Sequence, residues 1–322
     1  MIHLTRIGEK EAWRHTSTHW LMTAFFTFLC CMYAVAVDAT AVEITLLKSS
    51  DLKAYNEAVE GFKVAAPGTA TYTEYDLRGD LEQGKQLARK IRASDSSLVV
   101  AVGLKAALAA KLEILDIPIL YMMILDPMKY HLAAANITGV LLDIPTDRQL
   151  KVMRAFLPTV RRIGALYDPD TNSTKLKEAE SRASSHEFQL RGFPVENEKE
   201  VPQQLRSLLS ESEALWLIPD STALTDESIR FILQSAVANQ VPVVGFSSEF
   251  TRLGALLSMS IDYGEVGREA GLLAERILNG EQRLPLNPVS VRRIRITVNQ
   301  KTARYLGITI PKELDGLIDE TY

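Results

Sequence analysis

Cysteine is almost absent from this chain of 322 residues. Its two cysteines, Cys30 and Cys31, both lie within the first 41 residues, so the remainder has no thiol. Such a chain cannot be oxidised or mispaired outside the cytoplasm, and burial of apolar side chains alone must hold it together. About 280 residues remain, enough for two modest domains.

Histidine and the common catalytic motifs are scarce as well. Beyond residue 41 only His131 and His186 remain, and neither has a carboxylate or second histidine at helical ligand spacing. A metal site or a histidine-based triad is therefore disfavoured. No G-x-S-x-G elbow, phosphate loop or G-x-G-x-x-G motif occurs, since Gly264, Gly267 and Gly271 have the wrong spacing. We expect no catalytic residues, no metal and no cofactor.

Neither sign of charge is in large excess. The chain has 36 Lys and Arg against 40 Asp and Glu, a net charge of -4, which argues against a nucleic-acid partner. Two acid pairs, Asp168 with Asp170 and Asp126 with Asp220, could do acid–base work. Their flanking prolines favour turns instead, so an α/β enzyme is the less favoured alternative.

The first 41 residues have the form of an export signal. Arg6, Lys10 and Arg14 precede an uncharged run of 18 residues from Trp20 to Val37, and Ala39-Thr40-Ala41 offers a small-x-small cleavage site. We expect a cleaved signal peptide over 1–41 and a periplasmic location. Because the apolar run is long enough to span a bilayer, an uncleaved membrane anchor is the alternative.

From Val42 onward, short apolar runs alternate with amphipathic helical patterns. Apolar runs without polar alternation indicate parallel strands covered on both faces. The first set predicts strands over 42–47, 69–75, 98–102, 119–124 and 137–145, and helices over 52–62, 81–91 and 106–114. The second predicts strands over 163–167, 188–193, 214–218 and 243–246, and helices over 147–157, 175–183, 203–209 and 229–237.

One further strand–helix unit, Gly254 to Gly280, follows both sets. Ala255 to Met259 predicts a strand, Asp262 a helix N-cap and Gly280 the end of the helix. We expect this unit to carry the chain from the second set back to the first, which gives two lobes facing across a cleft.

Ligands of parallel sheets lie beyond the carboxyl ends of the strands, where helix N-termini offer free N–H groups. Hydroxyls and carboxylates dominate these loops, which would suit a small zwitterion: Asp220 or Asp126 could meet an ammonium group, and Ser50 a carboxylate. Each residue alone is equally well explained as a cap or a turn. The candidate ligand-binding residues are Ser49, Ser50, Gly103, Leu104, Lys105, Asp126, Tyr167, Asn172, Asp220, Ser221, Ser247, Asp262 and Tyr263.

Five segments carry a family resemblance: VAVGLKAALAAK at 100–111, ILDP at 124–127, NITGV at 136–140, LPTVRRIGALYDPDTNS at 157–173 and VNQKTARYLGITIP at 298–311. They resemble the solute-binding proteins of ABC importers, in particular the branch that includes binders of tryptophan and other aromatic amino acids. The chain departs from the family at three ligand positions. Gly103-Leu104-Lys105 stands where the family has Gly-Thr/Ser-Pro, Leu125 replaces a threonine before Asp126-Pro127, and Ser221 replaces an asparagine.

The resemblance implies the type I periplasmic binding protein fold, with two doubly wound parallel-sheet lobes joined by a three-strand hinge. Residues 42–141 plus 262–288 would form the first lobe and 142–261 plus 289–322 the second. The three crossings would fall near 141–145, 259–262 and 288–293. The helix at 264–279 would complete the first lobe, and 301–306 would pack on the second.

The function implied is that of an extracytoplasmic solute-binding protein of an ABC importer. A small molecule, such as an amino acid or related zwitterion, would be captured by hinge closure and presented to a membrane permease. We expect a monomer. The same two lobes could instead report their ligand to a membrane receptor, and this alternative stays open from the sequence.

Overall fold

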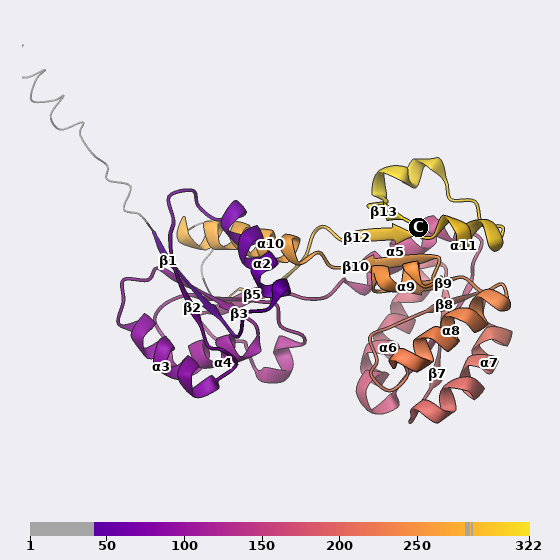
Figure 1. The fold of residues 1–322 in the computed structure, drawn as a ribbon, viewed down its shortest axis with the longest axis horizontal. Coiled ribbons are helices and arrows are strands. Elements are labelled where there is room, and N and C mark those ends of the chain that lie inside the picture. Colours follow the sequence, from indigo (N-terminus) through magenta and orange to yellow (C-terminus); the bar gives the residue numbers. More distant parts are fainter. Residues whose placement is uncertain (1–41, 281–283, 285) are drawn as a thin grey trace, which may run out of the picture. The chain divides into compact units, whose positions relative to one another are not determined.

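The computed structural model describes residues 42–280, 284 and 286–322. The expected leader therefore lies outside the described residues. Within them, no helix combines the length and the apolar character needed to cross a bilayer. They contain two separate β-sheets with flanking helices, which define a first and a second lobe (Figure 1).

The first lobe is built on a six-stranded sheet with the order β11-β5-β4-β3-β1-β2, and every pair is parallel. All five residues of β3 are buried, as a sheet covered on both faces requires. Its strands are β1 (Glu43–Lys48), β2 (Thr71–Asp76), β3 (Leu98–Val102), β4 (Ile119–Met122), β5 (Ile137–Leu141) and β11 (Val289–Ser290). Its helices are α2 (Lys53–Ala65), α3 (Leu81–Arg92), α4 (Leu104–Glu113), the 3-10 helix η1 (Pro127–Tyr130) and α10 (Tyr263–Leu278).

The second lobe has a seven-stranded sheet, β13-β12-β10-β9-β8-β6-β7. Its strands are β6 (Arg162–Tyr167), β7 (Gln189–Pro194), β8 (Ala214–Trp216), β9 (Val243–Gly245), β10 (Leu257–Ser260), β12 (Arg295–Val298) and β13 (Glu320–Thr321). Its helices are α5 (Thr146–Phe156), α6 (Pro169–Ala183), α7 (Val201–Glu211), α8 (Asp226–Ala238), α9 (Ser248–Arg252) and α11 (Gln300–Tyr305); the 3-10 turns are η2 (Ser184–His186), η3 (Glu198–Glu200) and η4 (Lys312–Leu317). Ala303 of α11 joins the core of this lobe.

The α/β class with two doubly wound sheets is confirmed, with one exception to parallel pairing. Strand β12 runs antiparallel to β10, with Leu257 opposite Val298. The reason is the path of the chain, because β10 leaves the second sheet toward the first lobe and β12 enters the second sheet on the way back.

The chain passes between the sheets three times: after β5, after β10 and after β11. Strand β11 pairs with β5, so Val289 and Ser290 belong to the first sheet, two residues beyond the expected boundary at 288. The first and third crossings touch each other, since Ser290 Oγ donates to Asp143 Oδ1 at 3.3 Å. Burial raises the pKa of Asp143, and the hydrogen bond from Ser290 opposes that shift.

Several expected boundaries are wrong near the strand ends. Helix α6 begins at Pro169 and not at 175, because Asp168 caps it and proline is favoured at the first helical position. Helix α9, at Ser248–Arg252, lies where a loop was expected. The expected strand 137–145 ends at Leu141.

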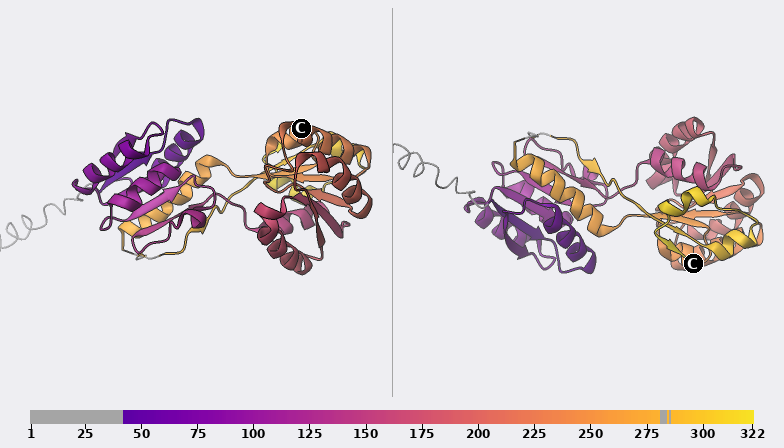
Figure 2. Two further views of the ribbon diagram at one scale, coloured as in Figure 1. Left: turned by 90° about the horizontal axis from the view of Figure 1, so that it is seen from below. Right: turned by 90° about the horizontal axis from the view of Figure 1, so that it is seen from above.

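Helix α10 packs against α2 at very short range, and the right-hand view in Figure 2 shows the orange α10 beside the indigo α2. A Cβ on Gly267 would lie 1.7 Å from the carbonyl oxygen of Ala58, and one on Gly61 would lie 2.0 Å from that of Gly264. Since real Cβ atoms do not approach carbonyl oxygens so closely, this interface requires glycine at both positions. Asp262 caps α10 as predicted, accepting hydrogen bonds from the N–H groups of Gly264 and Glu265.

Candidate functional site

The strand order of the first sheet changes direction between β1 and β3, so the loops after these strands form the expected ligand position of this lobe. Ser49, at the end of β1, is 6% exposed, and its Oγ accepts the N–H of Ala106 in the first turn of α4. Gly103 has φ 85°, a conformation that glycine adopts without strain. A Cβ there would lie 2.7 Å from Ser49 Oγ and 2.6 Å from the Tyr55 hydroxyl. Ser49, Tyr55 and Gly103 thus lie together at this position.

Leu104 and Lys105 are the first two residues of α4 rather than loop residues. Lys105 is exposed, and its Nζ donates to the carbonyl of Gly79 at 2.5 Å. Ser50 is half-buried, and its carbonyl oxygen accepts a hydrogen bond from the N–H of Leu52 at 3.1 Å. Asp126 is exposed, has φ 50°, and its carboxylate makes no side-chain cap to η1.

The second sheet changes direction between β6 and β8, and Asp220 lies in the loop after β8. This carboxylate is 8% exposed and accepts four hydrogen bonds. Oδ2 accepts from Asn172 Nδ2 at 2.8 Å and from the Asp168 N–H at 2.7 Å, while Oδ1 accepts from the N–H groups of Thr222 and Ala223 at 2.9 and 2.8 Å. Asp220 is therefore saturated by the protein.

Asp168 completes this network, which we call the Asp220 cluster: Asp168, Asn172, Asp220 and Thr222. The Thr222 hydroxyl donates to Asp168 Oδ2 at 2.7 Å, and the Asp170 N–H donates to Oδ1 at 2.9 Å. These bonds, that from Thr222 first, hold the pKa of Asp168 below its usual value. The cluster ties the loop after β6 to the loop after β8.

Three further candidates surround the second carboxyl edge. Tyr167 ends β6, and its ring lies against Gly192 of β7. Ser247 caps the short helix α9 by accepting the Glu249 N–H at 3.3 Å. Ser221 is exposed, beside the cluster in sequence.

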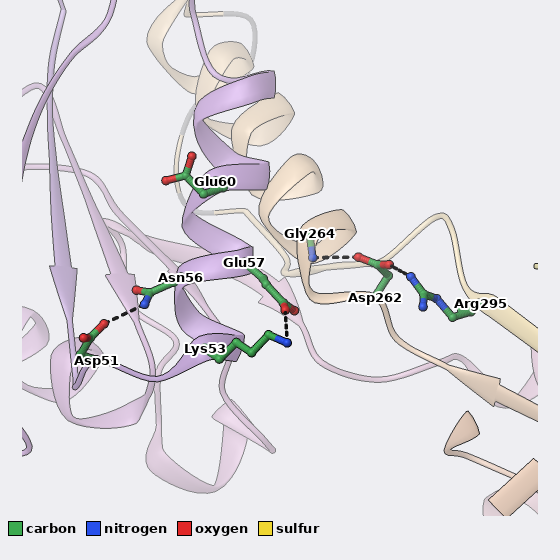
Figure 3. Close-up of a pocket in the computed structure, with 8 residues that line it drawn as sticks. All are labelled: Asp51, Lys53, Asn56, Glu57, Glu60, Asp262, Gly264 and Arg295. Atoms are coloured by element: carbon green, nitrogen blue, oxygen red, sulfur yellow. Dashed lines mark hydrogen bonds and ion pairs between the residues drawn. The ribbon is translucent and has the colours of Figure 1, made fainter. Parts of the chain in front are cut away.

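Asp262 and Tyr263 lie where the second crossing enters α10. Asp262 also meets Arg295 of β12, with 2.5 Å between its Oδ2 and the guanidinium, and Tyr263 is 39% exposed. Figure 3 shows Asp262 and Arg295 beside α2, at one end of an open groove. The groove is lined by Asp51, Lys53, Asn56, Glu57, Glu60, Asp262, Gly264 and Arg295.

The candidate residues chosen from the sequence do not include Tyr55, which lies at the first carboxyl edge, or Thr222, which belongs to the Asp220 cluster. In the sequence, Tyr55 falls on the apolar stripe of the helix expected over 52–62. Its position one turn after the β1 loop could have marked it as a candidate ligand-binding residue. Trp216, which ends β8, is 4% exposed and belongs to the core of the second lobe. Nowhere in the described ranges do three or more His, Cys, Asp or Glu side chains gather as metal ligands.

Known proteins provide a comparison for this arrangement. The chain is 22% identical over 241 residues to the tyrosine-binding protein of Clostridioides difficile (strain R20291), covering 72% of this chain and 69% of the other. A ligand-free, open substrate-binding protein with adhesive properties from Clostridium difficile matches with a TM-score of 0.71, 23% identity and coverage of 87% and 98%. An ABC domain in complex with L-Trp from Streptococcus pneumonia matches with a TM-score of 0.55, 22% identity and coverage of 88% and 100%.

The two solved structures share the fold with this chain, and the family is shown by a separate match to the family as a whole. Residues 43–321, which include both sheets, match the family described as ABC transporter substrate binding protein. The chain belongs to the ABC transporter substrate-binding protein family.

Proposed function

We propose that the ligand is an amino acid, with tyrosine and tryptophan as the first candidates, and that the two carboxyl edges bind it together. The family binds solutes for ABC transport. The names of a tyrosine-binding relative and of a structural neighbour with L-Trp support an aromatic amino acid. The observation that carries the proposal is the pair of polar carboxyl edges, one on each sheet, at the two points of direction change.

The carboxylates of Asp220 and Asp126 differ in how many hydrogen bonds they accept from the protein. Asp220 accepts four hydrogen bonds from the protein, so it serves to position its loops. Asp126 is exposed and lies after β4, next to the Gly103 turn in the sheet order. Asp126 is therefore the better partner for the ligand's ammonium group.

Aromatic side chains lie on both edges as well. Tyr55 packs at Gly103 in the first lobe, and Tyr167 ends β6 in the second. The Tyr55 hydroxyl is protonated at neutral pH, as burial raises its pKa further above the ordinary value of about 10, and it can donate a hydrogen bond to the ligand's carboxylate. The rings would form walls for an aromatic ligand.

Capture requires a change of angle at the crossings, which brings the edges together and excludes water from the polar contacts. The closed form would then be recognised by a membrane permease. We further propose that the protein is exported by its leader, acts as a monomer and carries out no catalytic step. The lobes would comprise residues 42–141 with 262–290 and 142–261 with 291–322.

A thermal-shift screen tests the ligand class. Residues 43–322 hold both complete sheets, so a chain beginning at Val42 is suitable. A ligand at 100 times its Kd adds about 2.7 kcal/mol, which raises the midpoint of a chain of this size by about 5 °C. We expect such a shift with L-tyrosine or L-tryptophan and a loss of it in Asp126→Asn. Shifts with other solutes only would refute the aromatic ligand, and an unchanged shift in Asp126→Asn would refute the role of that residue.

A further inference from the structure

Two arginines of the third crossing and one at the start of β12 face three acids along one side of α10 and its N-cap. Arg292 pairs with Glu269, Arg293 with Glu265 and Arg295 with Asp262. The order is antiparallel, so the sequence number of the acid falls as that of the arginine rises. The acids are spaced i, i+3 and i+7, which places them on one face of the helix. We call these pairs the hinge ladder; Figure 3 shows the pair of Asp262 and Arg295.

Glu269 is the most buried acid of the hinge ladder, and its partner Arg292 has a side chain that is 68% exposed. Glu269 is 7% exposed, and Arg292 Nε lies 2.8 and 2.9 Å from its two carboxylate oxygens. A buried carboxylate needs such a partner, because an unpaired charge in the interior is costly. The third crossing is therefore fastened to α10 at this point.

Arg293 differs from its neighbours because it has a partner in each lobe. Its guanidinium lies 4.0 Å from Glu265 of α10 and 3.2 Å from Asp319, which precedes β13 of the second sheet. Asp319 is fixed in turn, since its Oδ2 accepts the N–H of Ile296 in β12 at 2.8 Å. One side chain on the crossing thus contacts a carboxylate of each lobe.

The opposite face of α10 connects the hinge ladder to the candidate ligand site. Gly267 and Gly271 pack directly on the backbone of α2, so the two helices must move as one body. Helix α2 begins at Lys53, directly after the β1 loop that holds Ser49 and Ser50. A shift of the third crossing relative to α10 is therefore also a shift relative to that loop.

We propose that Arg293 controls the hinge angle by dividing its charge between Glu265 and Asp319, so that the balance between conformations depends on ionic strength. Glu265 moves with the first lobe and Asp319 with the second. A change of angle must alter at least one of the two distances, which gives the conformations different interaction energies. The inference concerns the hinge and does not rest on the identity of the ligand.

The exposure of these groups sets the size of the effect. The side chains of Arg293, Glu265 and Asp319 are 68%, 19% and 25% exposed, so salt can screen them. Ion pairs of this kind change an equilibrium by about two- to fivefold. Replacing Arg293 by glutamine should therefore have the same effect as raising the salt concentration.

Double electron–electron resonance measures this without a ligand. The chain from Val42 has no cysteine, so Gln86→Cys on α3 and Gln203→Cys on α7, both exposed helical positions, accept one spin label in each lobe. We expect the distance distribution to change between low and high salt. In Arg293→Gln the low-salt distribution should shift toward that of the unchanged chain at high salt, and added salt should have a smaller effect than in the unchanged chain.

The matched control is Arg89→Gln. Arg89 pairs with Glu113 within the first lobe, and this pair has side-chain exposures of 64% and 19%, close to those of Arg293 and Glu265. The control should keep the salt response. Glu265→Gln should shift the distribution in the same direction as Arg293→Gln, with no further shift in the double variant. A salt-independent distribution in the unchanged chain, or an unchanged salt response in Arg293→Gln, would overturn the proposal.

Discussion

Asn172 and Asp220, which lie 48 positions apart in sequence, are joined by a hydrogen bond of 2.8 Å between Asn172 Nδ2 and Asp220 Oδ2. Asn172 belongs to the start of α6 and Asp220 to the loop after β8, so the bond links that helix to that loop at the carboxyl edge of the second sheet. Because both side chains are buried, the bond is shielded from competing water.

The first prediction follows from the saturation of Asp220. Asp220→Ala leaves four donors without their acceptor, and we expect the free energy of unfolding to fall by about 3 kcal/mol. The neighbouring Ser221→Ala, an exposed position, should stay within about 0.5 kcal/mol of the unchanged chain. Urea unfolding of both variants measures the difference. Equal stabilities would contradict a structural role for Asp220.

The second prediction concerns the turn that begins α4. Gly103→Ala places a Cβ within 2.6 Å of the Tyr55 hydroxyl at φ 85°, so we expect a loss of about 2 kcal/mol and weakened ligand binding. Gly68→Ala is the matched control, because a Cβ there has nothing within 4 Å and its φ is not positive. Unfolding of the two variants at the same urea concentration would contradict the close contact between Tyr55 and Gly103.

The third prediction sets helix propensity against packing. Alanine for glycine within a helix stabilises by about 1 kcal/mol when nothing else changes. In Gly267→Ala the new Cβ meets the Ala58 carbonyl oxygen at 1.7 Å, so we expect a net loss of about 2 kcal/mol. A thermal midpoint above that of the unchanged chain would show that α2 and α10 separate without cost.

The fourth prediction is a pH dependence at Asp168. Its folded-state pKa is lowered by the Thr222 hydroxyl and by the Asp170 N–H. Its contribution to stability is therefore present above the ordinary value, about pH 4, and is lost as the pH falls through the lower folded value. Asp168→Asn should flatten the acid end of the stability curve, and Thr222→Val should flatten it partly. Curves that fall in parallel below pH 4 would contradict the assignment.

The alternation of strands and helices could be read from the sequence because it depends on local patterns. Strand β3 matches its predicted range of 98–102, because a run of five apolar residues has the length and pattern of a strand covered on both faces. The antiparallel β12 could not be read in this way. Its direction follows from the path of the chain between lobes and not from the pattern of its own residues.

The residues of the site were harder to predict than the loops that hold them. The rule for carboxyl edges selected the loop of Asp220, but it could not show that four protein donors already occupy the carboxylate. Tyr55 could not be predicted as a site residue, because an aromatic residue in the apolar stripe of a helix is usually a core residue. The ion pairs of the hinge ladder could not be predicted either, because partners such as Arg292 and Glu269 lie 23 positions apart in the sequence.

Calorimetric titration of the chain from Val42 with L-tyrosine and L-tryptophan tests the central claim, that the two lobes capture an aromatic amino acid. We predict saturable binding of one ligand per chain, with a negative heat-capacity change from the apolar surface buried on capture. The absence of heat with either amino acid, in protein first unfolded and refolded to remove any bound solute, would contradict the claim.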